Sequence, residues 1–325
     1  MNLGVTAVML PELDFEEQIA LCIELGLRYY QFRPRVIAEA QRGKPYSNHG
    51  NHKFDLTPQR LLQEGAVLTA KLRKAGLEPW GTLPSANIND PDETLRLHME
   101  GAAKAQARCV RVGPPPYPDK PFDYAELLDR VVRRYEEIIK TLSRPMGIKI
   151  IVETHCYSLV TSPGLAWAIC RHFDPRELGV IFDIANFTRE GEVRPNLAVS
   201  VLRDYIDCVH LGGGQHVVGE VDALGCNVVT VQSSAFENSD LHIPSWLNAL
   251  HEAGVKAPII IEDFAQKMTG PDRLRRDVAF LNKVLVKRVS NQRPAAGSQA
   301  GSSHNHARAF SICPSVPSNI TRSPG

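Results

Sequence analysis

The sequence lacks any long run of apolar residues. No stretch approaches the roughly 18 apolar residues that a membrane-spanning helix needs. The first residues also lack the basic segment followed by an apolar segment that marks a secretory signal peptide. We therefore expect a cytoplasmic protein that has no membrane partner.

The sequence also lacks an excess of charge of either sign. It contains 37 Lys and Arg against 36 Asp and Glu, so the formal net charge of the 325 residues is +1. Binding to nucleic acid depends strongly on a basic surface, because the phosphate backbone supplies most of the attraction. The overall charge therefore gives no reason to expect nucleic acid as a partner.

Paired cysteines at metal-binding or redox spacing are absent as well. The seven cysteines form no CxxC motif, and most of them lie inside apolar patterns: Cys22, Cys109, Cys156, Cys170, Cys208, Cys226 and Cys313. A buried cysteine behaves as a small hydrophobic residue. We therefore expect reduced, mostly buried thiols rather than disulfides or a zinc knuckle.

Glycine-rich nucleotide-binding motifs are missing too. No GxGxxG follows the first expected strand, and Gly212-Gly213-Gly214 comes late and lacks the lysine and hydroxyl of a phosphate-binding loop. An open, doubly wound sheet usually carries such a fingerprint. Its absence therefore favours another kind of α/β fold.

The chain does contain a regular alternation of strand-like and helix-like segments. About eight apolar segments are each followed by a helical pattern, starting with an expected strand at 3–10 and a helix at 15–25. Eight units of roughly 30 residues match a (β/α)8 TIM barrel. We predict one such α/β barrel over residues 1–289. Residues 290–325, rich in Ser, Pro, Gly, Ala and Asn, predict a disordered tail.

Four of the expected strands end in a residue that can bind a metal. The segments 150–153, 180–183, 207–210 and 259–262 are short apolar runs, and their last residues are Glu153, Asp183, His210 and Glu262. In a closed parallel barrel the carboxyl ends of all strands meet at one mouth. Three carboxylates and one imidazole form an oxygen-rich set that suits a divalent cation.

The same four strand ends resemble the xylose-isomerase-like TIM barrels, a group of sugar phosphate isomerases and epimerases that also includes the family 2 AP endonucleases. The phrases that carry the resemblance are IVETH at 151–155, FDIAN at 182–186, VHL at 209–211 and IEDF at 261–264. The resemblance covers residues 1 to about 289. It implies that the four strand-end residues bind one divalent metal, commonly manganese, magnesium or cobalt, with zinc as a further option.

Such a centre can perform proton transfer next to a carbonyl. A divalent cation can bind the adjacent carbonyl and hydroxyl oxygens of a ketose and acidify the proton on carbon. We expect Glu153 and Glu262 to act as the catalytic base and acid. Two bases on opposite faces produce epimerisation, and transfer between neighbouring carbons produces isomerisation. The expected partner is a small carbohydrate. The sequence leaves the oligomeric state open, and a homodimer is one option because dimers are common in the family.

Other residues at the expected mouth are candidates for substrate binding. They are His155, Asn186, His216, Arg111 and Arg33. Asn186 stands where many epimerases of the group carry a histidine. Residues 157–159 lack the second glutamate of the ketohexose 3-epimerases, which counts against a free ketohexose as substrate. The long connections 34–55 and 212–242 are expected to act as lids over the mouth.

Three alternative functions remain open at this point. A lyase, such as a dehydratase acting on a polyol or keto-inositol, would use the same enolate chemistry. An AP-endonuclease-like phosphodiesterase would need further metal-binding histidines. This chain has Val112, Gly113 and Asn186 at the positions where that branch carries them. A non-catalytic barrel would have to retain buried carboxylates, which are costly without a compensating cation.

Overall fold

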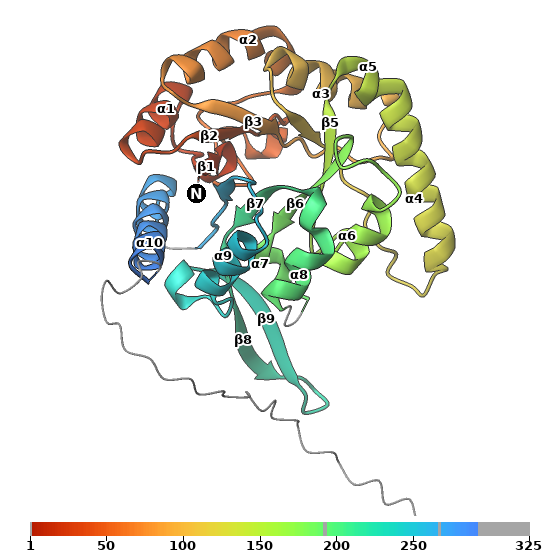
Figure 1. Ribbon diagram of the computed structural model, residues 1–325, viewed down its shortest axis with the longest axis vertical. Coiled ribbons are helices and arrows are strands. Elements are labelled where there is room, and N and C mark those ends of the chain that lie inside the picture. Colours follow the sequence, from red (N-terminus) through yellow and green to blue (C-terminus); the bar gives the residue numbers. More distant parts are fainter. Residues whose placement is uncertain (1, 191–193, 266–267, 292–325) are drawn as a thin grey trace, which may run out of the picture. The chain divides into compact units, whose positions relative to one another are not determined.

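Eight parallel strands close into a barrel in this computed structural model, which describes residues 2–190, 194–265 and 268–291 (Figure 1). The strands are β1 (Leu3–Thr6), β2 (Tyr29–Phe32), β3 (Glu78–Thr82), β4 (Cys109–Arg111), β5 (Lys149–Glu153), β6 (Leu178–Asp183), β7 (Ile206–Leu211) and β10 (Ile259–Ile261). Each pairs with its neighbour along the chain, except that β7 pairs with β10, and β10 closes the barrel on β1. The predicted (β/α)8 barrel is therefore confirmed.

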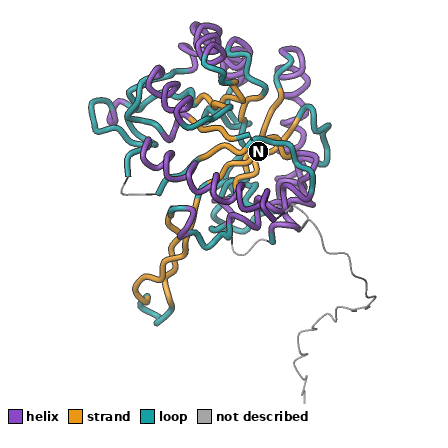
Figure 2. Tube along the Cα trace, turned by 60° about the vertical axis from the view of Figure 1, so that its left-hand side comes forward, coloured by secondary structure: helices purple, strands orange, loops and turns teal. Residues whose placement is uncertain are grey.

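Helices cover the outside of the strands (Figure 2). The longer ones are α1 (Phe15–Glu24), α2 (Pro58–Lys74), α3 (Asp92–Lys104), α4 (Tyr124–Ile138), α6 (Pro163–Cys170), α8 (Pro195–Leu202), α9 (Ile243–Glu252) and α10 (Gly270–Asn291). Local sequence sets their starts: the Asp14 side chain accepts a hydrogen bond from the Glu17 amide at 3.0 Å, and Thr57 caps α2 ahead of Pro58. Within the described residues, every helix is too short or too polar to cross a membrane.

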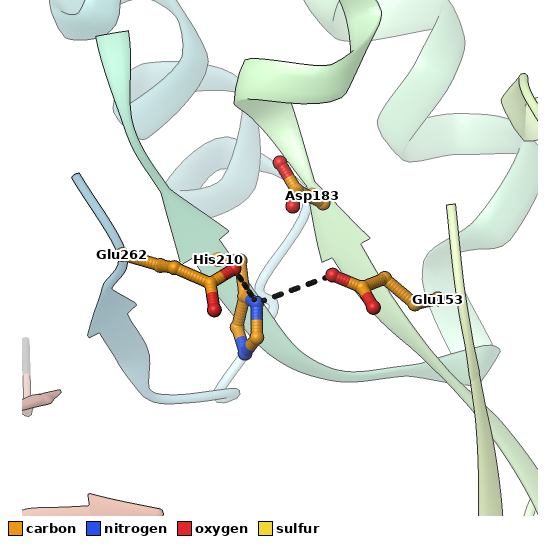
Figure 3. Close-up of side chains that lie close together, drawn as sticks. All are labelled: Glu153, Asp183, His210 and Glu262. Carbon is orange, nitrogen blue, oxygen red and sulfur yellow. Dashed lines mark hydrogen bonds and ion pairs between the residues drawn. The ribbon is translucent and has the colours of Figure 1, made fainter. Parts of the chain in front are cut away.

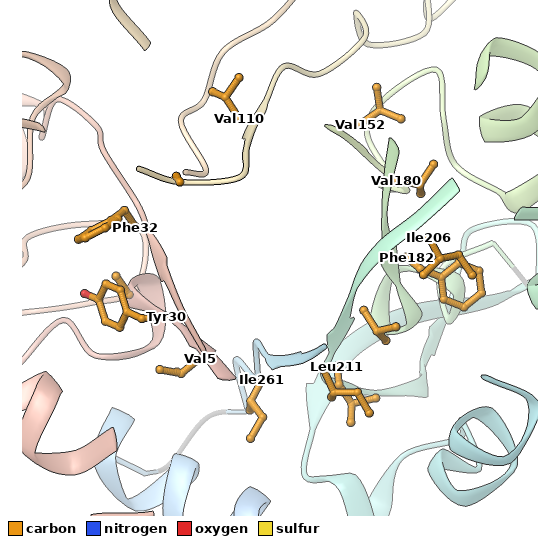
Figure 4. Packing of buried hydrophobic residues seen from close by; sticks show 14 of the residues in the cluster. Val5, Tyr30, Phe32, Val110, Val152, Val180, Phe182, Ile206, Leu211 and Ile261 are labelled. Carbon is orange, nitrogen blue, oxygen red and sulfur yellow. The ribbon is translucent and has the colours of Figure 1, made fainter. Parts of the chain in front are cut away.

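Alternate residues of the strands face in opposite directions. Residues such as Val110, Val152 and Phe182 belong to the main hydrophobic core, and Figure 4 shows side chains of this core directed away from the centre of the barrel. A second, smaller cluster on the other face of the strands fills the barrel interior. It consists of Tyr29, Trp80, Leu83, Cys109, Ile151, Ile181, Cys208 and Ile260. This period of two residues decides which side chains reach the mouth of the barrel.

The connection after β7 contains a β-hairpin that the sequence analysis missed. Strands β8 (Gly213–Val221) and β9 (Asn227–Ser234) pair antiparallel and project from the barrel (Figures 1 and 2). The Asp222 carboxylate accepts hydrogen bonds from the amides of Leu224 and Cys226, and Gly225 adopts a φ of +82°. This turn chemistry inside the 212–242 segment is typical of a hairpin.

The described cysteines are free thiols, as predicted. Five of them are buried and Cys226 is exposed on the hairpin, while Cys313 lies outside the described residues. Residues 1–285 form one compact unit. The predicted tail at 290–325 falls almost wholly outside the described residues, so the structure does not test it.

Candidate metal centre and active site

The strand periodicity brings the four predicted metal ligands together. Each stands two positions after an apolar residue of the barrel interior, as Glu153 follows Ile151 and Asp183 follows Ile181. Their side chains therefore point into the mouth. Glu153, Asp183, His210 and Glu262 each offer a ligand atom within 4.8 Å of the others (Figure 3). The structure thus forms a single cluster from residues that are up to 109 positions apart in the chain.

His210 is held in one orientation from both sides of its ring. Its Nε2 lies 2.9 Å from Oε1 of Gln31, an acceptor, so Nε2 carries a proton. Its Nδ1 lies 2.9 Å from Oε2 of Glu262 and 3.6 Å from Oε1 of Glu153. A ring nitrogen that faces two carboxylates needs a positive charge there, either a proton or a metal ion. This geometry is the usual one for a metal-bound histidine with a fixed tautomer.

Electrostatics show that the cluster is short of positive charge. Burial raises the pKa of Asp183 well above its ordinary value, and the carboxylates of Glu153 and Glu262 raise it further. Burial also acts to raise the pKa of Glu153, but Arg111 and His210 outweigh it and hold this pKa well below its usual range. Burial acts to lower the pKa of His210. The charge of Glu262, together with hydrogen bonds to Cys208 and Glu153, outweighs burial and raises this pKa well above its ordinary value.

The donor set fits a hard divalent cation. The side chains of Glu153, Asp183 and His210 are almost fully buried, and that of Glu262 is 13% exposed. Among the described residues, Arg111 is the one Lys or Arg that forms an ion pair with this cluster, through Glu153. Buried carboxylates without a cation are costly. Oxygen ligands with one imidazole are a suitable set for such an ion.

A cavity of about 380 Å³ opens over the cluster. Glu153, Asp183 and Glu262 form its floor, and four of the five predicted substrate-binding residues line its wall: Arg33, Arg111, His155 and Asn186. Both long connections contribute to it, through His49 and through the base of the β8–β9 hairpin. The two connections therefore form walls of the site, and their role as lids stays a prediction.

The lining residues are fixed by local hydrogen bonds. The Nδ1 atom of His155 accepts from the Tyr157 amide at 3.2 Å, so the neutral ring carries its proton on Nε2. Asn186 donates to the Thr154 carbonyl at 3.2 Å. His216 lies elsewhere, because its Nδ1 lies 2.9 Å from Asp240 on the hairpin side and the ring does not line the cavity. Its substrate-binding role stays a prediction without geometric support.

Several residues of the site were missed by the sequence analysis. Gln31, fully buried on β2, holds His210, while Ser85 and Arg189 line the cavity. His49 also lines it, and it belongs to the connection 34–55 that was expected over the mouth. Gln31 stands two positions after the interior residue Tyr29. The same period-two argument that identified the candidate ligands could therefore have found it. Ser85 lies on an irregular segment after β3, which gives no such signal.

Comparison with solved structures supports the fold. The IolI protein, in a crystal structure with a bound zinc atom, matches with a TM-score of 0.65 and 16% identity over 91% of this chain and 100% of that chain. L-ribulose 3-epimerase matches with a TM-score of 0.64 and 12% identity, over 92% and 100% of the two chains. A Mycobacterium smegmatis xylose isomerase-like TIM barrel protein in complex with magnesium matches with a TM-score of 0.59 and 13% identity, over 88% and 98%.

Comparison of the sequence itself gives the family. A search among curated proteins finds no match. The family model described as xylose isomerase-like TIM barrel matches residues 19–284, which is most of the chain. This match agrees with the closed eight-stranded barrel and with the resemblance noted at the strand ends. The chain therefore belongs to the xylose isomerase-like TIM barrel family.

Proposed function

We propose that this protein is a metal-dependent isomerase or epimerase that acts on a small sugar or sugar phosphate by proton transfer next to a carbonyl. The observation that carries the proposal is the position of the two glutamates. In the strand order β10-β7-β6-β5, Glu262 and Glu153 stand at the two ends of the arc that holds Asp183 and His210. Both also line the cavity, so they can reach a substrate from different sides.

The metal would be held by Glu153, Asp183, His210 and Glu262. When bound there, a divalent cation polarises a carbonyl and stabilises negative charge on its oxygen. We expect manganese, magnesium or cobalt, and zinc is the alternative. The zinc in IolI and the magnesium in the Mycobacterium smegmatis protein support a divalent ion in a barrel of this fold.

The chain's own residues supply the proton transfers. Glu153 is kept ionised by Arg111, and the ionised carboxylate is the form that can remove a proton from carbon. Glu262 would return a proton from the other side. The His155 Nε2 proton and the Asn186 side chain would bind substrate oxygens at the cavity wall. L-ribulose 3-epimerase shares this fold, which supports a reaction of the same kind.

A dehydratase acting on a polyol or keto-inositol remains the second candidate, because it begins with the same proton removal. The two reactions differ in whether water leaves the substrate. The endonuclease alternative has less support. In the part of the chain that the structure describes, the metal-binding cluster consists of four residues, and the neighbouring positions Val112 and Asn186 add no ligand.

Isotope exchange tests the proposal. The manganese-loaded protein is incubated in D2O with ketoses and their phosphates, and deuterium uptake at the carbon next to the carbonyl is followed by NMR. We expect uptake with at least one compound, and a loss of about 100-fold or more in Glu153→Gln and Glu262→Gln. Glu126→Gln, an exposed change on α4, should leave the rate unaltered.

Two results would contradict the proposal. One is full activity in either variant, and the other is no uptake with any compound although the protein holds its metal. Release of water together with uptake would instead identify the dehydratase.

A further inference from the structure

Three arginines line the cavity over the metal centre. They are Arg33, Arg111 and Arg189, and the carboxylates that line the same cavity are Glu153, Asp183 and Glu262. The arginines equal the carboxylates in number, although Arg111 alone of the three forms an ion pair with a carboxylate of the described cluster. A divalent cation bound to the cluster would therefore leave the lining with two excess positive charges. A neutral sugar would leave this excess uncompensated, whereas an anionic substrate would neutralise it.

Two of the arginines are fixed side by side by one short segment of chain. Arg33 donates to the Leu83 carbonyl and, at 3.3 Å, to the Ser85 hydroxyl. Arg111 donates to the intervening carbonyl of Pro84 from Nε at 3.2 Å and from Nη2 at 2.9 Å. Burial lowers the pKa of Arg33 to about 9, and the like charge of Arg111 contributes to the decrease, while the charges of Glu262 and Glu153 act in the opposite direction. The two guanidinium groups are thus close enough to repel each other.

Only one of this pair has a carboxylate partner. Arg111 forms an ion pair with Glu153, whereas Arg33 binds neutral acceptors and forms no ion pair with any described residue. A guanidinium has five N–H donors, so Arg33 keeps donors free for a planar or tetrahedral oxyanion. On another part of the wall, exposed Arg189 lies over the Tyr157 ring at 5.9 Å and likewise has no described carboxylate partner.

We propose that the substrate carries an oxyanion, a carboxylate or a phosphate, and that Arg33 and the Ser85 hydroxyl bind it at the wall of the cavity. This inference rests on the proposed function, since the oxyanion belongs to the carbohydrate whose carbonyl lies at the metal centre. The substrate class is then a sugar acid or a sugar phosphate. Two charge-assisted hydrogen bonds from one guanidinium give the group both affinity and orientation.

Calorimetric binding tests the inference without requiring turnover. The probes are D-fructose, D-fructose 6-phosphate and D-fructuronate, titrated into the manganese-loaded protein. We expect at least one anionic probe to bind about tenfold or more tightly than D-fructose, and Arg33→Gln to abolish that preference. Arg130→Gln removes an exposed arginine of α4 and should retain it. Metal content and the circular dichroism spectrum show whether each variant is intact.

Further variants protect the test against misfolding. Arg33→Lys keeps the charge and should retain part of the preference, and Ser85→Ala should weaken binding of the anionic probe by about threefold to tenfold. A preference for phosphate or for carboxylate supports the inference and identifies the oxyanion. Equal affinity for all three probes would overturn it, as would an unchanged preference in Arg33→Gln.

The two proposals can fail separately. Anion-selective binding without deuterium exchange would leave this inference standing and contradict the isomerase. Deuterium exchange on neutral sugars without anion-selective binding would support the isomerase and overturn the inference of an anionic substrate.

Discussion

Replacing Asp183 with Asn should stabilise the metal-free protein. The Asp183 side chain is 4% exposed, accepts a hydrogen bond from the Asn186 amide at 3.1 Å and has no ion pair among the described residues. Burial and two neighbouring carboxylates raise its pKa well above the ordinary value. Asparagine keeps the size and the capping oxygen of the side chain but removes its charge.

The expected gain follows from the geometry of the cluster. Its ligand atoms lie within 4.8 Å of one another. Two like charges at that separation repel by about 3 kcal/mol at an effective dielectric constant of about 20. Since Asp183 can take up a proton and so escape part of this cost, we expect Asp183→Asn to stabilise the metal-free protein by about 1–3 kcal/mol. In a unit of this size that gain raises Tm by about 2–5 °C.

Metal should reverse the order of stability. At a concentration of about 1,000 times Kd, a ligand that binds only the folded state adds about 4.1 kcal/mol, which exceeds the gain expected from the substitution, and the variant has lost one ligand. The assay is calorimetric unfolding at pH 8 with a chelator and then with manganese. Asp174→Asn is the control. The Arg176 side chain lowers the pKa of Asp174 to about 2, so the negative charge of Asp174 favours the folded state. Removing that charge should therefore destabilise the protein. A metal-free Asp183→Asn protein that is less stable than the wild type would refute the reasoning.

Three further predictions concern other parts of the molecule. Gln31→Leu removes the acceptor that orients His210 and should weaken manganese binding about 10-fold to 100-fold, measured by competition with a chelator; unchanged affinity would contradict this. Gly65→Ala places a Cβ 2.8 Å from the backbone nitrogen of Ala105 and should lower the free energy of unfolding by about 1–3 kcal/mol. Gly164→Ala, where the Cβ meets open space in α6, should raise Tm slightly. Equal effects of the two substitutions on Tm would contradict this prediction. Burial and a neighbouring carboxyl raise the pKa of Asp277 to about 7, so its stabilising contribution, complete below pH about 4, is lost as pH rises through 7. The Tm of Asp277→Asn relative to wild type should therefore rise between pH 5 and pH 8, and a flat difference would argue against this assignment.

The barrel and the gathering of the four candidate metal ligands at its mouth could be predicted because both depend on local, periodic signals. A buried parallel strand is recognisable as a short apolar run, and its carboxyl end marks the mouth. Glu153 and Asp183 end their strands, and Glu262 follows β10 directly. Where the local signal was mixed, the boundary moved: the first strand, expected to reach residue 10, ends at Thr6 and a short helix, Ala7–Met9, follows.

Four of the wall residues were predicted, but the contacts that fix the walls of the site could not be predicted in the same way. The pairing of Arg33 with Arg111 depends on the carbonyls of Leu83 and Pro84, which lie on an irregular segment after β3. The contact of Gln31 with His210 joins residues 179 positions apart. Such contacts depend on the closure and register of the barrel, which no local pattern records.

Metal content tests the central claim most directly. The purified protein is exchanged into manganese, passed through a desalting column and analysed beside Glu153→Gln, Glu262→Gln and the exposed control Glu126→Gln. We predict about one equivalent of manganese in the wild type and the control, and a loss or clear decrease in the two cluster variants. No bound metal in the wild type, or equal binding in all four proteins, would contradict a metal centre at the mouth of this barrel.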